Sequence, residues 1–278
     1  MLWTFFVLIA SGSALALLLG VYLPRWRLRR ALREPFPDHW LASLQRLPFY
    51  SRLPRALQGE LRHKIKAFLH QKEFVGCEGL VVDDGMRVQI AAAACLLLLN
   101  RPSTGYRSLH WIYLFPGEFR SRIPERDENG VVSHASGTLA GLSFENGRVV
   151  LAWESVQAGF GRPDDGYNVV LHEFAHQLDQ EDGSADGAPL LYAREDYEAW
   201  STVFNAEFDR LHEILDRGGE SPIDPYGATD PAEFFAVVTE LFYERPGRLA
   251  DYSPALFDTL SHYYPVDPRQ WQGPGIAA

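Results

Sequence analysis

The sequence predicts an α+β domain preceded by one N-terminal transmembrane helix, and three patterns support this prediction. Residues 1–23 carry no charged side chain. Beyond them, apolar residues first recur at helical spacing, then gather in short strand-like runs, and then return to helical spacing. Helices followed by a small sheet and then by further helices are typical of a single α+β domain.

The composition excludes several classes of protein. The chain has 278 residues, of which 46% are hydrophobic and 22% are charged, so it can bury a substantial core. Its formal net charge is −10, and an acidic surface does not suit a nucleic-acid binder, so we expect no nucleic-acid partner. The two cysteines, Cys77 and Cys95, are too few for a disulfide framework or a cysteine-rich metal site.

The uncharged segment 1–23 is long enough to cross a bilayer, which takes about 20 apolar residues. A cleaved secretory signal carries basic residues before its apolar run and a small-residue cleavage site after it. Here the basic residues follow the run, as Arg25, Arg27, Arg29, Arg30 and Arg33. We therefore expect an uncleaved anchor, with its arginine-rich flank and the main domain in the cytoplasm.

The rest of the chain is expected to contain a linker, a domain and a tail. Residues 24–49 combine the arginines with prolines and are predicted to be a basic juxtamembrane segment and linker, with further prolines up to about residue 55. Residues 50–265 are predicted to form the domain, and residues 266–278 a C-terminal tail. Helices are expected near residues 56–74, 88–99, 167–180, 193–215 and 231–243, and strands at 111–115 and 149–153. The second of these strands is either an interior strand or an edge strand that binds a peptide by strand addition.

The segment LHEFAHQLD, residues 171–179, contains the motif H-E-x-x-H. His172 and His176 are four residues apart on an expected helix, so both imidazoles project from one face and can bind one metal ion. Glu173 lies beside that face and can serve as general base for a metal-bound water. Because the flanking residues are apolar, the helix is expected to be buried, where unpaired polar groups are costly. The motif therefore predicts a metal site.

Two histidines do not complete a catalytic zinc site, which usually has three protein ligands and a water. Further candidate ligands lie downstream at His212, His262, Glu233 and Glu240. In the segment YGATDPAEFFAVVTE, Asp230 is a good N-cap and Pro231 a good first helical residue. Glu233, three residues after the cap, is then equally typical of a capping box. Spacing alone supports the ligand role and the capping role of Glu233 equally.

The segments HEFAHQLD and YGATDPAEFFAVVTELF closely resemble the Mlc titration factor A family of bacterial zinc peptidases. The resemblance covers roughly residues 50–265. The motif is also similar to that of the anthrax lethal factor catalytic domain, which has a tyrosine seven residues before its glutamate ligand. The resemblance implies a zincin-like metallopeptidase domain with one Zn²⁺ held by His172, His176 and Glu233, with Glu173 as base and Tyr226 near the oxyanion.

The resemblance also implies a function and a location. It implies a zinc-dependent, aminopeptidase-like peptidase with a regulatory role, acting on a peptide or protein substrate. Because a member of the family sequesters a glucose-regulated transcriptional repressor, the alternative is a zinc-containing binding module with a repressor as partner. Combined with the anchor, this predicts a single-pass protein of the bacterial inner membrane with its catalytic domain facing the cytoplasm. A cytoplasmic protein is the alternative.

The sequence departs from the thermolysin-type pattern at one position. In that pattern an acid four residues after the glutamate ligand orients one of the histidines. Here that position is Val237, so the orienting group must come from elsewhere. Asp179 and Glu240 are the candidates, and each is equally consistent with a solvated charge on a helix face.

Overall fold

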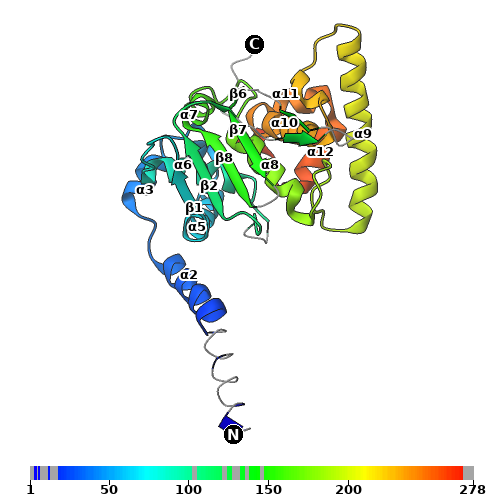
Figure 1. Cartoon of the computed structure of the whole chain (residues 1–278). Helices are drawn as coiled ribbons and strands as arrows, with labels where there is room; N and C mark the ends of the chain where they lie inside the picture. The colour runs from blue at the N-terminus through cyan, green and yellow to red at the C-terminus, as the bar shows by residue number, and fades with distance from the viewer. Residues whose placement is uncertain are drawn as a thin grey trace.

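The computed structural model describes residues 3, 4, 6, 12, 18–101, 105–120, 124–126, 132–134, 138–144 and 147–271. Figure 1 shows a small sheet with helices packed behind it, and the C-terminal helices gathered beyond helix α8. The chain is a mostly helical α+β domain, which confirms the predicted class.

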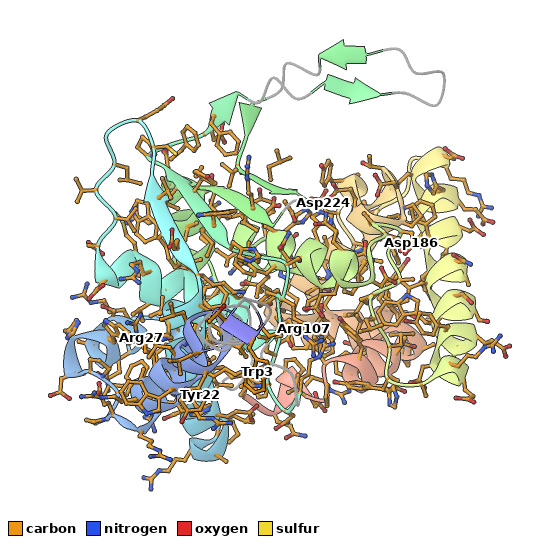
Figure 2. All side chains as sticks on the ribbon, turned by 60° about the horizontal axis from the view of Figure 1, so that its bottom comes forward. Trp3, Tyr22, Arg27, Arg107, Asp186 and Asp224 are labelled. Carbon is orange, nitrogen blue, oxygen red and sulfur yellow. The ribbon has the colours of Figure 1, made fainter. Side chains whose placement is uncertain are left out.

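The predicted anchor, residues 1–23, lies mostly outside the described residues. No helix of the described part combines the length and the apolar composition needed to cross a bilayer. From residue 18 the chain forms a π-helical turn, η1 (Leu18–Tyr22), and then α2 (Leu23–Arg33), which carries the five arginines. Figure 2 labels Tyr22 and Arg27 on this helical segment. The anchor stays a prediction.

The segment expected as a linker packs on the domain instead. It contains α3 (Asp38–Leu44) and α4 (Pro48–Arg52), and its apolar side chains Leu44, Leu47 and Tyr50 are at most 3% exposed. The prolines begin helices here rather than prevent them, because a missing N–H costs nothing in the first helical turn. Pro48 occupies the first turn of α4, and Pro54 precedes α5 (Arg55–Gln71).

The expected tail also begins in contact with the domain. A 3₁₀ turn, η4 (Pro268–Trp271), follows residue 265, and Val266 and Trp271 are both buried. The expected tail beyond Trp271, residues 272–278, lies outside the described residues.

The main sheet has four strands in the order β1-β2-β8-β7. Strands β1 (Glu73–Gly76), β2 (Trp111–Phe115) and β8 (Arg148–Ala152) are parallel, and β7 (Gly141–Phe144) is antiparallel to β8. The interior alternative for the strand at 149–153 is therefore right and the edge alternative wrong, because β2 and β7 pair with both sides of β8. Two short pairs are separate from this sheet: β3 (Phe119–Arg120) with β6 (Thr138–Leu139), and β4 (Pro124–Arg126) with β5 (Val132–His134).

Helices carry most of the core. Each helix expected from periodicity is present, with its ends shifted by a few residues. The remaining elements are α6 (Asp84–Leu96), α7 (Trp153–Gly161), α8 (Val169–Asp179), η2 (Gln180–Asp182), α9 (Arg194–Asp216), η3 (Pro225–Ala228), α10 (Pro231–Glu244), α11 (Pro246–Tyr252) and α12 (Pro254–Tyr263). Helices α8 and α10 are buried along nearly their whole length and pack against each other.

Asn168 joins the start of α8 to the end of α10. Its Oδ1 accepts hydrogen bonds from Val170 N and Leu171 N, each at 3.2 Å, and so caps α8. Its Nδ2 donates to Glu244 Oε1 at 3.2 Å, and its backbone N–H donates to Glu240. Burial raises the pKa of Glu244 to about 9, so this carboxyl is protonated at neutral pH in the folded chain.

The raised pKa of Glu244 predicts a pH-dependent stability. An unfolded glutamate titrates at 4.5, so the unfolded chain releases a proton between pH 4.5 and 9 that the folded chain keeps. The stability contributed by this group therefore falls as pH rises through that window. Glu244→Gln should raise the free energy of unfolding by about 1–3 kcal/mol at pH 8 and change it little at pH 5. Denaturant unfolding at the two pH values measures this, and an equal gain at both would contradict the assignment.

Candidate metal centre

The two histidines of the H-E-x-x-H motif converge, as the helical spacing predicts. Both lie on α8, and their Nε2 atoms are 3.2 Å apart. His172 is 9% exposed, and His176 is partly buried. Two imidazole nitrogens this close in a buried setting require either a shared proton or a cation between them.

Glu233 brings a carboxylate to the same point from α10. Its Oε2 lies 3.0 Å from His172 Nε2 and 3.4 Å from His176 Nε2. The cap of α10 is provided by Asp230, whose Oδ1 accepts from Glu233 N at 2.9 Å. The side chain of Glu233 thus lies against the histidines, which favours the ligand role over the capping role.

The donor set fits a four-coordinate metal ion. Within the described residues, His172, His176 and Glu233 form the one group of three such side chains whose ligand atoms all lie within 4.8 Å of one another. Bonds of about 2.0–2.1 Å to a tetrahedral zinc would separate the ligand atoms by about 3.3 Å, close to the distances observed. Glu233 Oε2 is also buried without a well-oriented hydrogen bond, as expected of an atom that ligates a cation. Although burial opposes it, the closeness of the two histidines holds the pKa of Glu233 well below its usual range.

Glu240 fills the orienting role that Val237 cannot. Its Oε1 accepts from His172 Nδ1 at 2.7 Å, and its Oε2 accepts from the backbone N–H of Asn168. Glu233 and Glu240 are seven residues apart, so both carboxylates project from one face of α10 toward His172. A carboxylate on the second ring nitrogen fixes the tautomer and the ring orientation of a ligating histidine.

The other candidates from the sequence serve different purposes. Asp179 Oδ2 accepts from Gly187 N at 3.0 Å and so holds the loop that follows α8. His212 packs edge-on against Phe208 with ring centroids 4.6 Å apart, and His262 Nε2 lies 3.6 Å from Asp196 Oδ1.

Glu173 and Tyr226 lie beside the cluster. Glu173 is 5% exposed, and its Oε2 has no hydrogen-bond partner. Burial raises the pKa of Glu173 to about 7, against the opposing effect of His172 and His176. Tyr226 is 53% exposed in η3, with its ring centroid 6.0 Å from that of His172 and its hydroxyl hydrogen-bonded to Glu233. Burial and the nearby carboxylates raise the pKa of Tyr226 well above its usual value, so its hydroxyl stays a donor.

A cleft of about 340 Å³ opens onto these residues. Its walls come from the start of the edge strand β7, the start of α8, η3 and the middle of α10. It is lined by Glu118, Ala140, Gly141, Gly166, Tyr167, Val169, His172, Glu173, Asp224, Tyr226, Val237 and Glu240. A substrate in this cleft would contact Glu173 and Tyr226 together with His172 of the cluster.

Comparison with known proteins identifies the family. The model of the family described as glucose-regulated metallo-peptidase M90 matches residues 23–265. The chain belongs to the M90 metallopeptidase family. It is 41% identical over 245 residues to an uncharacterized protein of Synechocystis. The aligned region covers 87% of this chain and 89% of that protein. It is 34% identical to the Mlc titration factor A of Klebsiella pneumoniae (81% and 84% covered) and of Serratia proteamaculans (87% and 92% covered).

Sequence reasoning missed several residues that build this M90 site. Asn168 had a detectable signal, because an asparagine just before an apolar helical run is a typical N-cap. Gly141 had none, although a Cβ at this position would lie 2.5 Å from Glu173 Oε1 and 2.8 Å from Val169 Cγ2. Only a glycine therefore lets strand β7 approach Glu173 so closely.

The close approach at Gly141 predicts a selective defect. Gly141→Ala should displace the Glu173 carboxylate while leaving the three candidate ligands in place, because the atoms nearest to the added methyl belong to Glu173 and Val169. Peptidase kcat should fall by about 10²-fold with bound metal unchanged, as measured by kinetics and elemental analysis. Gly59→Ala, where no atom lies within 4 Å of the added Cβ, is the control and should keep full activity. Full activity of Gly141→Ala would mean that strand β7 does not hold the base in place.

Proposed function

We propose that this chain is a zinc-dependent peptidase that binds one Zn²⁺ through His172, His176 and Glu233. The observation that carries the proposal is the convergence of these three ligand atoms beside a buried carboxylate that lines a cleft. Membership of a metallopeptidase family supports it. The zinc ion and the residue roles are proposals, whereas the cluster itself is a property of the fold.

The residues of the cleft suit the hydrolysis of a peptide bond. A zinc ion at the cluster would supply Lewis acidity, polarising the scissile carbonyl and making a bound water more acidic. Glu173 takes a proton from the attacking water and delivers it to the leaving amine. Tyr226 donates its hydroxyl hydrogen to the developing oxyanion, in place of its interaction with Glu233. Glu240 keeps His172 in one tautomer throughout.

The cleft also supports a proposal about the substrate. Its volume of about 340 Å³ suits one or two residues of a peptide, which agrees with aminopeptidase-like cleavage of short substrates. Gly141, the first residue of edge strand β7, lines the cleft, so a peptide in extended conformation could pair with the free edge of that strand.

Protein binding is the second candidate function. The relatives from Klebsiella and Serratia are named Mlc titration factor A, and this name refers to a binding partner rather than to a substrate. By analogy, this chain would sequester a transcriptional repressor. A pure binding module needs neither a carboxylate beside the cluster nor a tyrosine hydroxyl at the mouth of the cleft, and both are present.

Metal content tests the proposed ligand set. Elemental analysis of the purified protein should find close to one zinc per chain. His176→Ala and Glu233→Ala should each lower that content, because each removes one of three protein ligands. His212→Ala should leave it unchanged, since His212 packs against Phe208 away from the cluster. Full zinc content in Glu233→Ala would exclude Glu233 as a ligand.

Two substitutions separate a peptidase from a binding module. Glu173→Gln should keep the zinc and the fold but reduce kcat by about 10²–10⁴-fold, because the base is lost. Tyr226→Phe should reduce kcat by about 10²–10³-fold with KM little changed, because one oxyanion donor is lost. The assay is hydrolysis of amino-acid arylamides and of short peptides, with and without a chelator. Wild-type rates in Glu173→Gln would mean that the hydrolysis does not come from this site, and would favour the binding module.

A further inference from the structure

The cleft beside the metal cluster is rich in carboxyl groups. Of the residues that border it, four are carboxylates and none is a lysine or arginine, as far as the structure describes the chain. The four are Glu118, Glu173, Asp224 and Glu240. Such a surface disfavours acidic substrates and attracts cations, because a cleft with protein walls focuses the field of its charges.

Two of these carboxylates already have a structural or chemical role. Glu240 is bound by His172 and by the backbone N–H of Asn168. Glu173, the proposed base, is 5% exposed and presents an Oε2 without a hydrogen-bond partner. A buried polar atom without a partner at the wall of a cleft points to a ligand or water that enters the cleft, and this observation is separate from the charge count.

The other two carboxylates have no part in the proposed chemistry, although Asp224 caps η3. Glu118 follows strand β2, and Asp224 precedes η3, so they come from two elements that border the cleft. Figure 2 labels Asp224 on the side of the sheet that faces α8 and α10. Both residues are exposed, and neither forms an ion pair with a lysine or arginine of the described chain. Asp224 Oδ1 accepts from Tyr226 N at 2.8 Å, which leaves the charge of the carboxylate uncompensated.

All four carboxylates influence the pKa of the Tyr167 hydroxyl. Burial raises the pKa of Tyr167 to about 12, and Glu240, Glu173, Glu118 and Asp224 each raise it further. The Tyr167 side chain lines the cleft and is 49% exposed, so its ring also offers a π face to a substrate. Aromatic faces bind ammonium and guanidinium groups and pack against their methylene stems.

We propose that Glu118 and Asp224, with Tyr167, select peptides that carry a positively charged group next to the scissile bond. The group is the ammonium of a lysine side chain or the guanidinium of an arginine side chain. This specificity rests on the proposed peptidase function and deepens it. Glu118 and Asp224 are specificity residues, whereas Glu173 and Tyr226 act on the scissile bond.

The test compares peptides that differ in one charge. In a set of short peptides, lysine is replaced at each position in turn by norleucine, which removes the ammonium group and leaves an apolar side chain. Each peptide is made with a free and with an acetylated N-terminus, and cleavage with and without chelator is followed by mass spectrometry. Loss of rate on the change to norleucine supports the proposal, whereas loss on acetylation alone shows only the aminopeptidase-like preference for a free α-amine. If the change to norleucine does not lower kcat/KM, the proposal is wrong.

Variants then assign the preference to the two carboxylates. Asp224→Asn keeps an oxygen that can accept from Tyr226 N, and Glu118→Gln keeps the side-chain shape. Each should lower the preference for the charged peptide by about two- to fivefold, the range of exposed ion pairs, and the double variant should nearly abolish it. The wild-type preference should also shrink as salt is raised. Asp209→Asn, an exposed position on α9 outside the cleft, is the control and should keep the full preference. A preference that survives in the double variant would overturn the assignment.

A binding measurement separates this proposal from the peptidase proposal. Glu173→Gln, which should not turn over substrate, is titrated with a labelled lysine peptide and with its norleucine counterpart, using fluorescence anisotropy. Tighter binding of the lysine peptide that is lost when Asp224→Asn and Glu118→Gln are added supports cation recognition even if no cleavage is found. Equal binding of the two peptides contradicts cation recognition even if the protein is an active peptidase.

Discussion

The site depends on His172 lying between two carboxylates of one helix. Its Nε2 is 3.0 Å from Glu233 Oε2 and its Nδ1 is 2.7 Å from Glu240 Oε1. Because the two glutamates are seven residues apart on α10, one helix face supplies both a candidate ligand and the group that orients the histidine. Glu244 lies one turn beyond Glu240 on α10, and its carboxyl accepts a hydrogen bond from Asn168 at the start of α8. The relative position of α8 and α10 is therefore fixed by polar contacts as well as by packing.

The polar contacts are stable because the two helices are buried. In an apolar interior a histidine or carboxylate without a partner would strongly destabilise the fold. Any shift of α10 along α8 would break several of these buried polar contacts at once. The same burial leaves Glu173 Oε2 and Glu233 Oε2 without well-oriented hydrogen bonds. Both atoms lie in or beside the cluster, where a bound metal ion or ligand would give them partners.

The sheet contributes through its edge. Strand β7 begins at Gly141, where the lack of a side chain lets the backbone lie against Glu173 and Val169. The free edge of β7, the start of α8 and η3 then enclose a cleft in which Tyr226, Tyr167 and the acidic residues Glu118 and Asp224 meet. The cluster and the exposed acidic residues thus lie on different elements. Helices α8 and α10 carry the cluster, while the loops before η3 and after β2 carry Asp224 and Glu118.

Local pattern alone determined the helices, the H-E-x-x-H pair and the start of α10 at Asp230, because helical spacing and capping act within a few residues. It left Glu233 between ligand and cap, and it left Asp179 and Glu240 equal as orienting groups. Only the packing of α8 on α10 separated them, because the whole core sets the distances from His172 to Glu233 and Glu240, which lie 61 and 68 positions further along the chain. Tertiary structure also placed β8 inside the sheet and residues 38–53 against the core, although their prolines predicted a linker. The sequence pattern does not reveal the parts played by Gly141, Glu118 and Asp224. Each contributes through its position next to residues of other elements, which only the tertiary structure shows.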